Sequence, residues 1–492
     1  MGEEGQPSEQ AAPIPDPDAA VGGENVEGKS PQTESPDEIT AEATRHDDTE
    51  LERSLGLVGG FSIGIGTMIG AGIFVFPGIA AQEAGPAAAV SFGIGAIIAL
   101  LVALPTSELA TAMPRSGGGY YFISRAMGTL PGAVVGLSLW FGLVFASAFY
   151  LVGFGYYAVD LLRELGFGVG TTLVTPLAVL FGIVFTVLNM TGTENAAKLQ
   201  NAIVALLLSL LVVFLLIGSF DALGIRGSYD APGEFVPAGW LPVLTTAALV
   251  FTSYLGFAQV ATVAGEMQSP GRNLPLAMIG SVVLVGIMYV VTIFVVTSVL
   301  SPTDLEQLAD QGMLETALVT VGRELLGPVG AFAIVFGGLL ATMSSANASI
   351  LSSSRAIYAT SRDALFPLWA SRVNLTYGTP HVALGLAGGP ILVLAATGRV
   401  AILAEVASFL HLIMYGLICV SLLVVRRNPP EWYAPAFHVP GGPVIPVLGA
   451  LSSFGLVLLM QPLSQVLGVL FIILTASWYF YYGRDIRLRG VL

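Results

Sequence analysis

The chain alternates long hydrophobic runs with short polar connections from residue 55 almost to its last residue. About twelve of these runs approach the roughly 20 residues that an α-helix needs to cross a bilayer. The predicted spans are 55–81, 86–112, 130–161, 172–190, 196–220, 241–265, 276–300, 328–360, 380–397, 401–425, 444–460 and 463–482. The pattern therefore predicts an all-α membrane protein.

Two of the predicted spans are interrupted near their middle by residues that form helices poorly. In the first span these residues are Gly64, Gly66, Gly70 and Gly72, and each glycine weakens a helix by about 1 kcal/mol relative to alanine. The sixth span carries the polar, glycine-containing run 251–257. Unwound backbone in a membrane is tolerated only where it is buried in protein or lines a cavity. Close helix packing through small residues is the alternative explanation.

The two interruptions occupy matching positions if the chain is divided into two five-helix halves, at 55–220 and 240–425. Paired interruptions of this kind indicate the substrate site of a transporter. A half-helix that begins near Ile73 presents free N–H groups to a carboxylate, and one that ends near Ser253 presents free carbonyls to an ammonium group. An α-amino acid carries both groups. Because neither interruption contains a charged side chain, a neutral amino acid is favoured.

The charged residues set the orientation and mark off an N-terminal segment. Residues 1–50 contain 14 acidic residues against two basic ones, which is typical of a disordered tail; residues 51–492 form the predicted transporter domain. With the N-terminus inside, 13 basic residues fall on inner loops and four on outer loops. The positive-inside rule therefore predicts that both ends are cytoplasmic. A single cysteine, Cys419, excludes an internal disulfide.

Four segments resemble motifs of the amino acid–polyamine–organocation permeases. They are GTMIGAGIFVFP at 66–77, ELATAMPRSGGGYY at 108–121, SYLGFAQVATVAGEMQSPGRNLP at 253–275 and SSANASILSSSRAIYATSRDALFP at 344–367. The resemblance extends over nearly all of residues 51–492. It implies the bacterial leucine-transporter fold, with two inverted five-helix repeats and two further helices at about 444–482, in the cell membrane. It also implies movement of amino acids driven by protons, by sodium or by exchange.

Carried over by position, the resemblance implies a substrate site at the two interruptions. The substrate carboxylate would bind the amides of Ala71, Gly72 and Ile73. Its amine would face carbonyls of the segment around Ser253 and of the first span, namely those of Met68, Phe251 and Tyr254 or Leu255. An aromatic ring, Phe251 or Tyr254, would close over the substrate. Some relatives have an acidic residue where this chain has Ala258, which also favours a neutral substrate.

The resemblance further implies one sodium site and no other cofactor. Its ligands would be the carbonyls of Gly66, Ile69 and Ala341 and the hydroxyls of Ser344 and Ser345. The last three share one helix face because of their i, i+3, i+4 spacing. The serines could instead bond to their own helix. Some proton-driven relatives place a lysine from span five here, and the apolar run 202–217 contains none. Sodium and proton coupling both stay open.

Two acidic residues near the predicted inner ends of spans two and six, Glu108 and Glu266, are candidates for gating or proton transfer, since carboxylates in membrane helices are functional candidates by default. Alternatively, they pair with Arg115, Arg125 or Lys198. Two further acids, Asp160 and Glu405, lie nearer the outer face, where we expect them to contact water.

Other function classes fit the sequence less well. It contains no Walker loop, no His-Glu-x-x-His and no Gly-x-Ser-x-Gly motif, so an enzyme is not expected. The predicted partners are an amino acid and the lipid bilayer, without nucleic acid, and the sequence does not set the oligomeric state. The alternatives are an exchanger of amino acids or polyamines and a membrane sensor of solutes.

Overall fold

The computed structural model describes residues 53, 55–115, 118–191, 196–225, 234–374 and 379–484, with the backbone alone at 196–201. The predicted disordered tail, residues 1–50, lies outside these residues. In the described part the chain is helical and contains no β-strand; Leu55 and Met267 form one isolated parallel bridge.

Nine helical segments of the described residues are long and apolar enough to cross a membrane. Three shorter apolar helices, Leu57–Met68, His381–Ala395 and Val444–Val457, coincide with predicted spans one, nine and eleven. This result confirms an all-helical protein of the membrane type. The full count of twelve crossings and the inverted repeat remain predictions.

The helices of the first half follow the predicted spans closely. They are α2 (Leu57–Met68), α3 (Ala71–Ala84), α4 (Ala88–Ala112), α5 (Gly118–Met127), α6 (Thr129–Glu164), α7 (Val174–Thr191) and α8 (Ala196–Ala222), with short 3₁₀ turns η1 (Gly85–Ala87) and η2 (Thr171–Leu173). The short helix α5 occupies the connection between predicted spans two and three.

The remaining elements belong to the second half and to the two helices that follow it. They are α9 (Trp240–Val250), η3 (Phe251–Ala258), α10 (Gln259–Thr262), η4 (Ala264–Glu266), α11 (Pro270–Val299), α12 (Pro302–Asp310), η5 (Leu314–Thr316), α13 (Ala317–Arg362), η6 (Leu368–Ser371), α14 (His381–Ala395), α15 (Val400–Arg427), and then α16 (Val444–Val457), α17 (Pro462–Trp478) and the π-helical turn η7 (Tyr479–Gly483). Helix α13 kinks at Gly327, whose φ of 65° suits glycine. The kink precedes Pro328, where the eighth span was predicted to begin.

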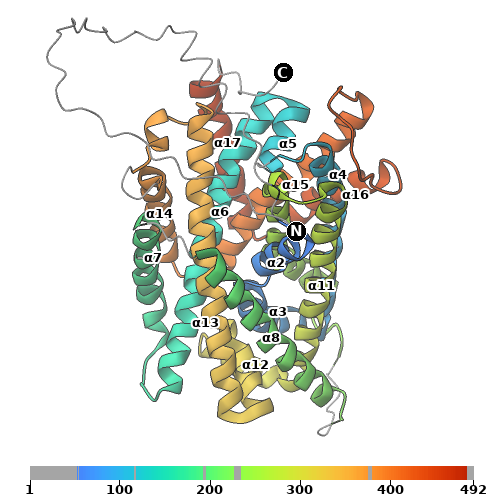
Figure 1. Cartoon of the computed structure of the whole chain (residues 1–492). Helices are drawn as coiled ribbons and strands as arrows, with labels where there is room; N and C mark the ends of the chain where they lie inside the picture. The colour runs from blue at the N-terminus through green and yellow to red at the C-terminus, as the bar shows by residue number, and fades with distance from the viewer. Residues whose placement is uncertain are drawn as a thin grey trace, which may run out of the picture. The chain divides into compact units, whose positions relative to one another are not determined.

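The long helices run roughly side by side, with α2 and α3 in the interior (Figure 1). Helices α7 and α14 pack against each other at one edge. The short helices α5 and α12 lie at opposite ends of the bundle (Figure 1). This is the arrangement expected if one connection faces the cytoplasm and the other faces the outside.

The first predicted interruption is confirmed as a break between α2 and α3. Helix α2 ends at Met68, and Ile69 (ψ 74°) and Gly70 (φ −117°, ψ −145°) depart from helical geometry before α3 begins. The Gly70 N–H donates to the Met68 carbonyl over 2.8 Å. Among the described residues no side chain caps the N-terminus of α3. The first amides of an α-helix have no acceptor within the helix, so those of α3 also lack a side-chain cap.

The second interruption is a change of winding rather than an open turn. Helix α9 ends at Val250, and the next eight residues form the 3₁₀ helix η3. A 3₁₀ helix bonds each carbonyl to the amide three residues later. The expectation of free carbonyls near Ser253 therefore holds only in part, because hydrogen bonds along η3 already use some of their capacity.

Candidate functional site

The two interruptions touch each other at Gly256. A Cβ atom added there would lie 2.5 Å from the carbonyl carbon of Thr67 and 2.6 Å from the amide nitrogen of Met68. The Thr67 hydroxyl also donates to the Gly256 carbonyl over 2.9 Å. Since contact at this distance leaves no room for a side chain, the glycine is what lets the two backbones meet.

The N-terminus of α3 presents buried donors beside η3. Ala71, Gly72 and Ile73 are buried, and a buried amide without a partner is costly. Ser253 is only 4% exposed, and its hydroxyl has no hydrogen-bond partner among the described residues. That hydroxyl lies 2.3 Å from where a Gly72 Cβ would be. Amides and a hydroxyl, all suited to a carboxylate, thus gather at one point.

The carbonyl side of the predicted site already has donors from two tyrosines. The Tyr289 hydroxyl on α11 donates to the Met68 carbonyl over 2.8 Å and approaches the Ser253 carbonyl at 3.3 Å. The Tyr415 hydroxyl on α15 donates to the Leu255 carbonyl over 2.8 Å. Sequence reasoning missed both residues. The available signal was that a tyrosine in an apolar span needs a partner for its hydroxyl.

The two candidate gating rings have different surroundings. The Tyr254 hydroxyl donates to the Phe92 carbonyl of α4 over 2.9 Å, and its ring lies against Gly95. Phe251 is fully buried, with its ring centroid 6.3 Å from those of both Tyr254 and Tyr415. Tyr254 is therefore tied to α4 by a hydrogen bond, whereas the Phe251 side chain has no polar group and is held by packing alone.

One predicted cation ligand on α13, Ser345, faces the break in the first span. The Ser345 hydroxyl lies 2.3 Å from where a Gly70 Cβ would be, and Ala341 and Ser344 are buried on the same helix. Gly66 faces α8, with Val204 2.9 Å from its Cβ position. The described residues contain no group of three or more His, Cys, Asp or Glu side chains that could hold a metal. A cation here would therefore depend on carbonyl and hydroxyl oxygens, which suit sodium.

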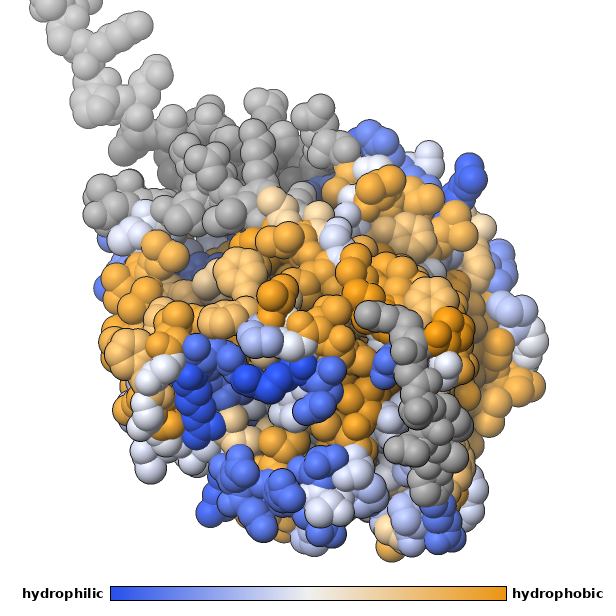
Figure 2. Space-filling model, turned by 90° about the horizontal axis from the view of Figure 1, so that it is seen from below, coloured by the Kyte–Doolittle hydropathy of each residue, from blue (hydrophilic) through white to orange (hydrophobic). Residues whose placement is uncertain are grey.

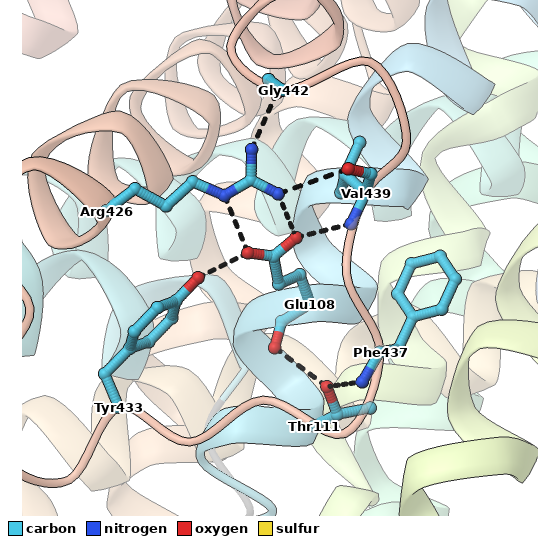
Figure 3. Close-up of polar contacts among 7 residues, drawn as sticks. All are labelled: Glu108, Thr111, Arg426, Tyr433, Phe437, Val439 and Gly442. Carbon is cyan, nitrogen blue, oxygen red and sulfur yellow. Dashed lines mark hydrogen bonds and ion pairs between the residues drawn. The ribbon is translucent and has the colours of Figure 1, made fainter.

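Glu108 is paired with Arg426 and not with the proposed Arg115 or Arg125. The side chain of Lys198, the third proposed partner, lies outside the described residues. The Glu108 carboxylate contacts Arg426 of α15, whose Nε donates over 2.8 Å, and the Tyr433 hydroxyl (Figure 3). The proposed partner Arg125 instead lies over the Tyr121 ring at 5.3 Å. The prediction missed Arg426 because 318 residues separate it from Glu108.

Tyr433 and Glu266 are two further polar residues at this end of the bundle. Burial, together with the hydrogen bond to Glu108, raises the pKa of Tyr433 to about 12, so its hydroxyl stays a donor. Glu266 forms no ion pair within the described part of the chain. Its backbone carbonyl accepts the Leu55 N–H over 3.0 Å, which ties the ends of spans one and six together.

A cavity of about 410 Å³ lies on the side predicted to face outward. Its lining includes Ile79, Tyr156, Glu315, Arg399 and Gln461. Figure 2, which views the molecule from below, shows hydrophilic residues in the middle of this face and along the lower edge of the view, with hydrophobic residues mainly above and at the sides. Ile79 lies seven residues, or about 10 Å, beyond Gly72 on α3, and the buried residues Phe74, Val75 and Phe76 separate the cavity from the α3 N-terminus.

The expectation that the two outer acids contact water is wrong. Asp160 is 5% exposed and Glu405 is 2% exposed. Asp160 lies 3.6 Å from Arg163, and Glu405 accepts the backbone N–H of Gln461 over 3.1 Å. Both carboxylates have partners supplied by neighbouring residues or connections, which is the usual condition for burying them.

Comparison with known proteins gives the family. A family model described as amino acid permease matches residues 55–486. The chain belongs to this family. The resemblance to the amino acid–polyamine–organocation permeases is thereby confirmed, and the family consists of transporters.

Characterised relatives of this permease differ in the substrates that their names state. The branched-chain amino acid permease BcaP of Bacillus subtilis (strain 168) is 29% identical over 88% of this chain and 94% of its own length. The methylthioribose transporter of the same organism is 26% identical, over 86% and 91%. The serine/threonine exchanger SteT, also from that organism, is 25% identical, over 90% and 99%. The family is therefore clear, while the substrate differs among its members.

Proposed function

We propose that this permease is a secondary active transporter that moves neutral amino acids across the cell membrane by alternating access. The observation that carries the proposal is the group of buried donors at the N-terminus of α3. The amides of Ala71, Gly72 and Ile73 and the Ser253 hydroxyl converge there, with no charged side chain in either interruption. A carboxylate supplies the acceptor that these donors need.

The rest of the substrate follows from this anchor. The amine faces the carbonyls of η3, and those of Phe251 and Tyr254 are the preferred acceptors because tyrosines already donate to Met68 and Leu255. The Phe251 ring closes over the side chain of the amino acid. The absence of a charge in the two interruptions makes a cationic or anionic side chain costly to bury there.

Sodium is the proposed coupling ion, carried as a co-substrate. The carbonyls of Gly66, Ile69 and Ala341 and the hydroxyls of Ser344 and Ser345 would hold it. The approach of Ser345 to Gly70 supports this proposal, because it brings α13 against the break that also forms the substrate site. Sodium binding and substrate binding would then order the same residues at the break between α2 and α3. This coupling would let the sodium gradient drive uptake of the amino acid. Proton coupling, with Glu108 or Glu266 as carriers, is the alternative.

The proposal includes the topology. Twelve helices in a five-plus-five inverted repeat with two further helices would place both termini in the cytoplasm. A role as an enzyme is not proposed. Exchange of amino acids or polyamines is the alternative mode, supported by the stated function of SteT. A membrane sensor that binds a solute without moving it is the other alternative.

Uptake by the purified protein in liposomes tests these proposals together. We expect uptake of neutral amino acids such as alanine, serine or leucine, driven by an imposed sodium gradient, and little uptake of arginine or polyamines. Uptake that occurs only with amino acid inside the liposomes would establish exchange. Binding without any flux would establish a sensor. Uptake of arginine without uptake of any neutral amino acid would overturn the substrate proposal.

A further inference from the structure

The carboxylate of Glu108 is fully buried at the end of α4, with 0% of its side chain exposed. It accepts hydrogen bonds from the Nε and Nη2 atoms of Arg426, from the Tyr433 hydroxyl and, over 2.6 Å, from the Val439 N–H (Figure 3). Both oxygens therefore have two donors each. Removing one partner of such an ion pair strongly destabilises a protein, because the other charge is left buried without a partner.

The same residues tie down the connection between α15 and α16. The Nη1 atom of Arg426 donates to the Gly442 carbonyl over 2.6 Å. The Phe437 N–H donates to the Thr111 hydroxyl over 3.3 Å (Figure 3). Glu108 and Thr111 lie one turn apart on α4 and bind two amides of this connection. The connection is thus fastened along the end of α4 rather than held at a single point.

Helices α4, α15 and α16 are also in close contact further into the bundle. A Cβ added at Gly449 of α16 would lie 2.6 Å from the Leu101 carbonyl of α4 and 2.8 Å from the Cys419 sulfur of α15. Backbones this close cannot slide past one another without opening a gap. The ion pair and the packing therefore hold the same three helices together.

Helix α15 in turn holds the η3 segment of the candidate substrate site. The Thr252 hydroxyl donates to the Ala404 carbonyl over 2.7 Å and lies 2.5 Å from the Ser408 hydroxyl. Tyr415 bonds to the Leu255 carbonyl. The position of α15 therefore affects the position of η3.

We propose that Glu108, Arg426 and Tyr433 form a permanent α4–α15 clasp, which makes these two helices move as one body during transport. The three side chains are positioning residues for η3 and act on it through the helices rather than by direct contact. On α4, Glu108 lies 13 residues, or about 20 Å, from Gly95, which contacts Tyr254 of η3. A gate that opened in every cycle would have to strip the fully buried Glu108 carboxylate of its four hydrogen bonds each time. The inference rests on the proposed transport function.

A cross-link across the clasp distinguishes a permanent connection from a gate. In Thr111→Cys/Phe437→Cys protein, oxidation joins α4 to the α15–α16 connection, while Cys419 is buried and stays unmodified. We expect the oxidised protein to transport within about twofold of the reduced protein. Each single-cysteine variant serves as the control for oxidation itself. Loss of transport on oxidation that returns on reduction would overturn the proposal.

Loosening the clasp gives a second test that does not need a cross-link. We expect Glu108→Gln to lower kcat at least tenfold while KM changes less than threefold. Arg426→Lys keeps the charge and should lower kcat less than Glu108→Gln does. The neighbouring Arg427 is exposed, so Arg427→Gln is the matched control and should transport normally. A Glu108→Gln protein with the kcat of the unaltered permease would contradict a positioning role.

A distance measurement separates this inference from the proposed function. Ile97 on α4 and Val424 on α15 are exposed, so spin labels can be attached at cysteines placed there. We expect the distance between the labels to stay constant whether sodium, alanine, both or neither is added to the purified protein. A change of about 3 Å or more in the distance between the labels, with or without amino acid transport, would contradict the proposal of a permanent clasp. Failure of transport with a constant distance would count against the proposed function alone.

Discussion

Replacing Gly256 with alanine tests whether the two broken helices must touch for the permease to work. The added Cβ would lie 2.5 Å from the Thr67 carbonyl carbon, whereas carbon atoms in favourable contact are about 3.5–4.0 Å apart. The obstacle is backbone, so the helices must separate by about 1 Å. Overpacking of this kind costs about 1–3 kcal/mol, while alanine gains about 1 kcal/mol over glycine in helical backbone.

The matched control is Gly93→Ala on α4, where an added Cβ meets nothing within 4 Å. That variant should be as stable as the unaltered protein or slightly more stable, and should transport normally. Gly256→Ala should unfold at a lower temperature than the control and lose at least tenfold in uptake, because binding sites tolerate misplacement of only about 0.5 Å. Thermal unfolding in detergent and uptake in liposomes measure both. If the two variants behave alike, the interruptions do not need this contact.

The remaining predictions concern groups that hold or use the site. Tyr289→Phe removes the hydroxyl that bonds to the Met68 carbonyl, a bond worth about 0.5–1.5 kcal/mol; calorimetry should show weaker amino acid binding, and unchanged affinity would contradict this role. Thr252→Val leaves Ser408 without its hydroxyl partner and should lower the free energy of unfolding by about 1–3 kcal/mol, seen as a lower unfolding temperature; an unchanged unfolding temperature would count against the α15 contact. Ser345→Ala should raise the sodium concentration needed for half-maximal uptake severalfold, whereas uptake that persists when choline replaces sodium would exclude sodium coupling. Phe251→Ala should speed the release of bound substrate in filter assays; an unchanged release rate would remove Phe251 as the gate.

The sequence predicted the helices and both interruptions well because their signals are local. Four glycines within nine positions weaken the first span whatever surrounds it, and the break falls at Ile69 and Gly70 within that cluster. The Gly327–Pro328 pair similarly marks where the eighth span begins. Hydrophobic periodicity and helix propensity depend on residues that are close together in the chain, so both can be read from a single sequence.

The partners of buried polar groups could not be predicted in the same way. Glu108 was recognised as a candidate, but Arg426 lies 318 residues away, and nothing local in the sequence connects them. Tyr289 and Tyr415 were missed because the carbonyls that they bond to come within reach only when the chain folds and α2 and η3 pack beside α11 and α15. Asp160 and Glu405 were expected in water because their burial depends on packing with distant segments; Glu405, for example, accepts the N–H of Gln461, 56 residues away. These are properties of packing rather than of local pattern.

The central claim is that bare peptide groups at the two interruptions hold the carboxylate and the amine of an amino acid. Competition for leucine uptake by two analogues tests it most directly: leucinamide lacks the carboxylate, and 4-methylpentanoate lacks the amine. We predict that leucine competes fully and that both analogues compete at least a hundredfold more weakly, since each leaves one set of buried groups unpaired. Equal competition by either analogue would show that the site does not recognise the corresponding group.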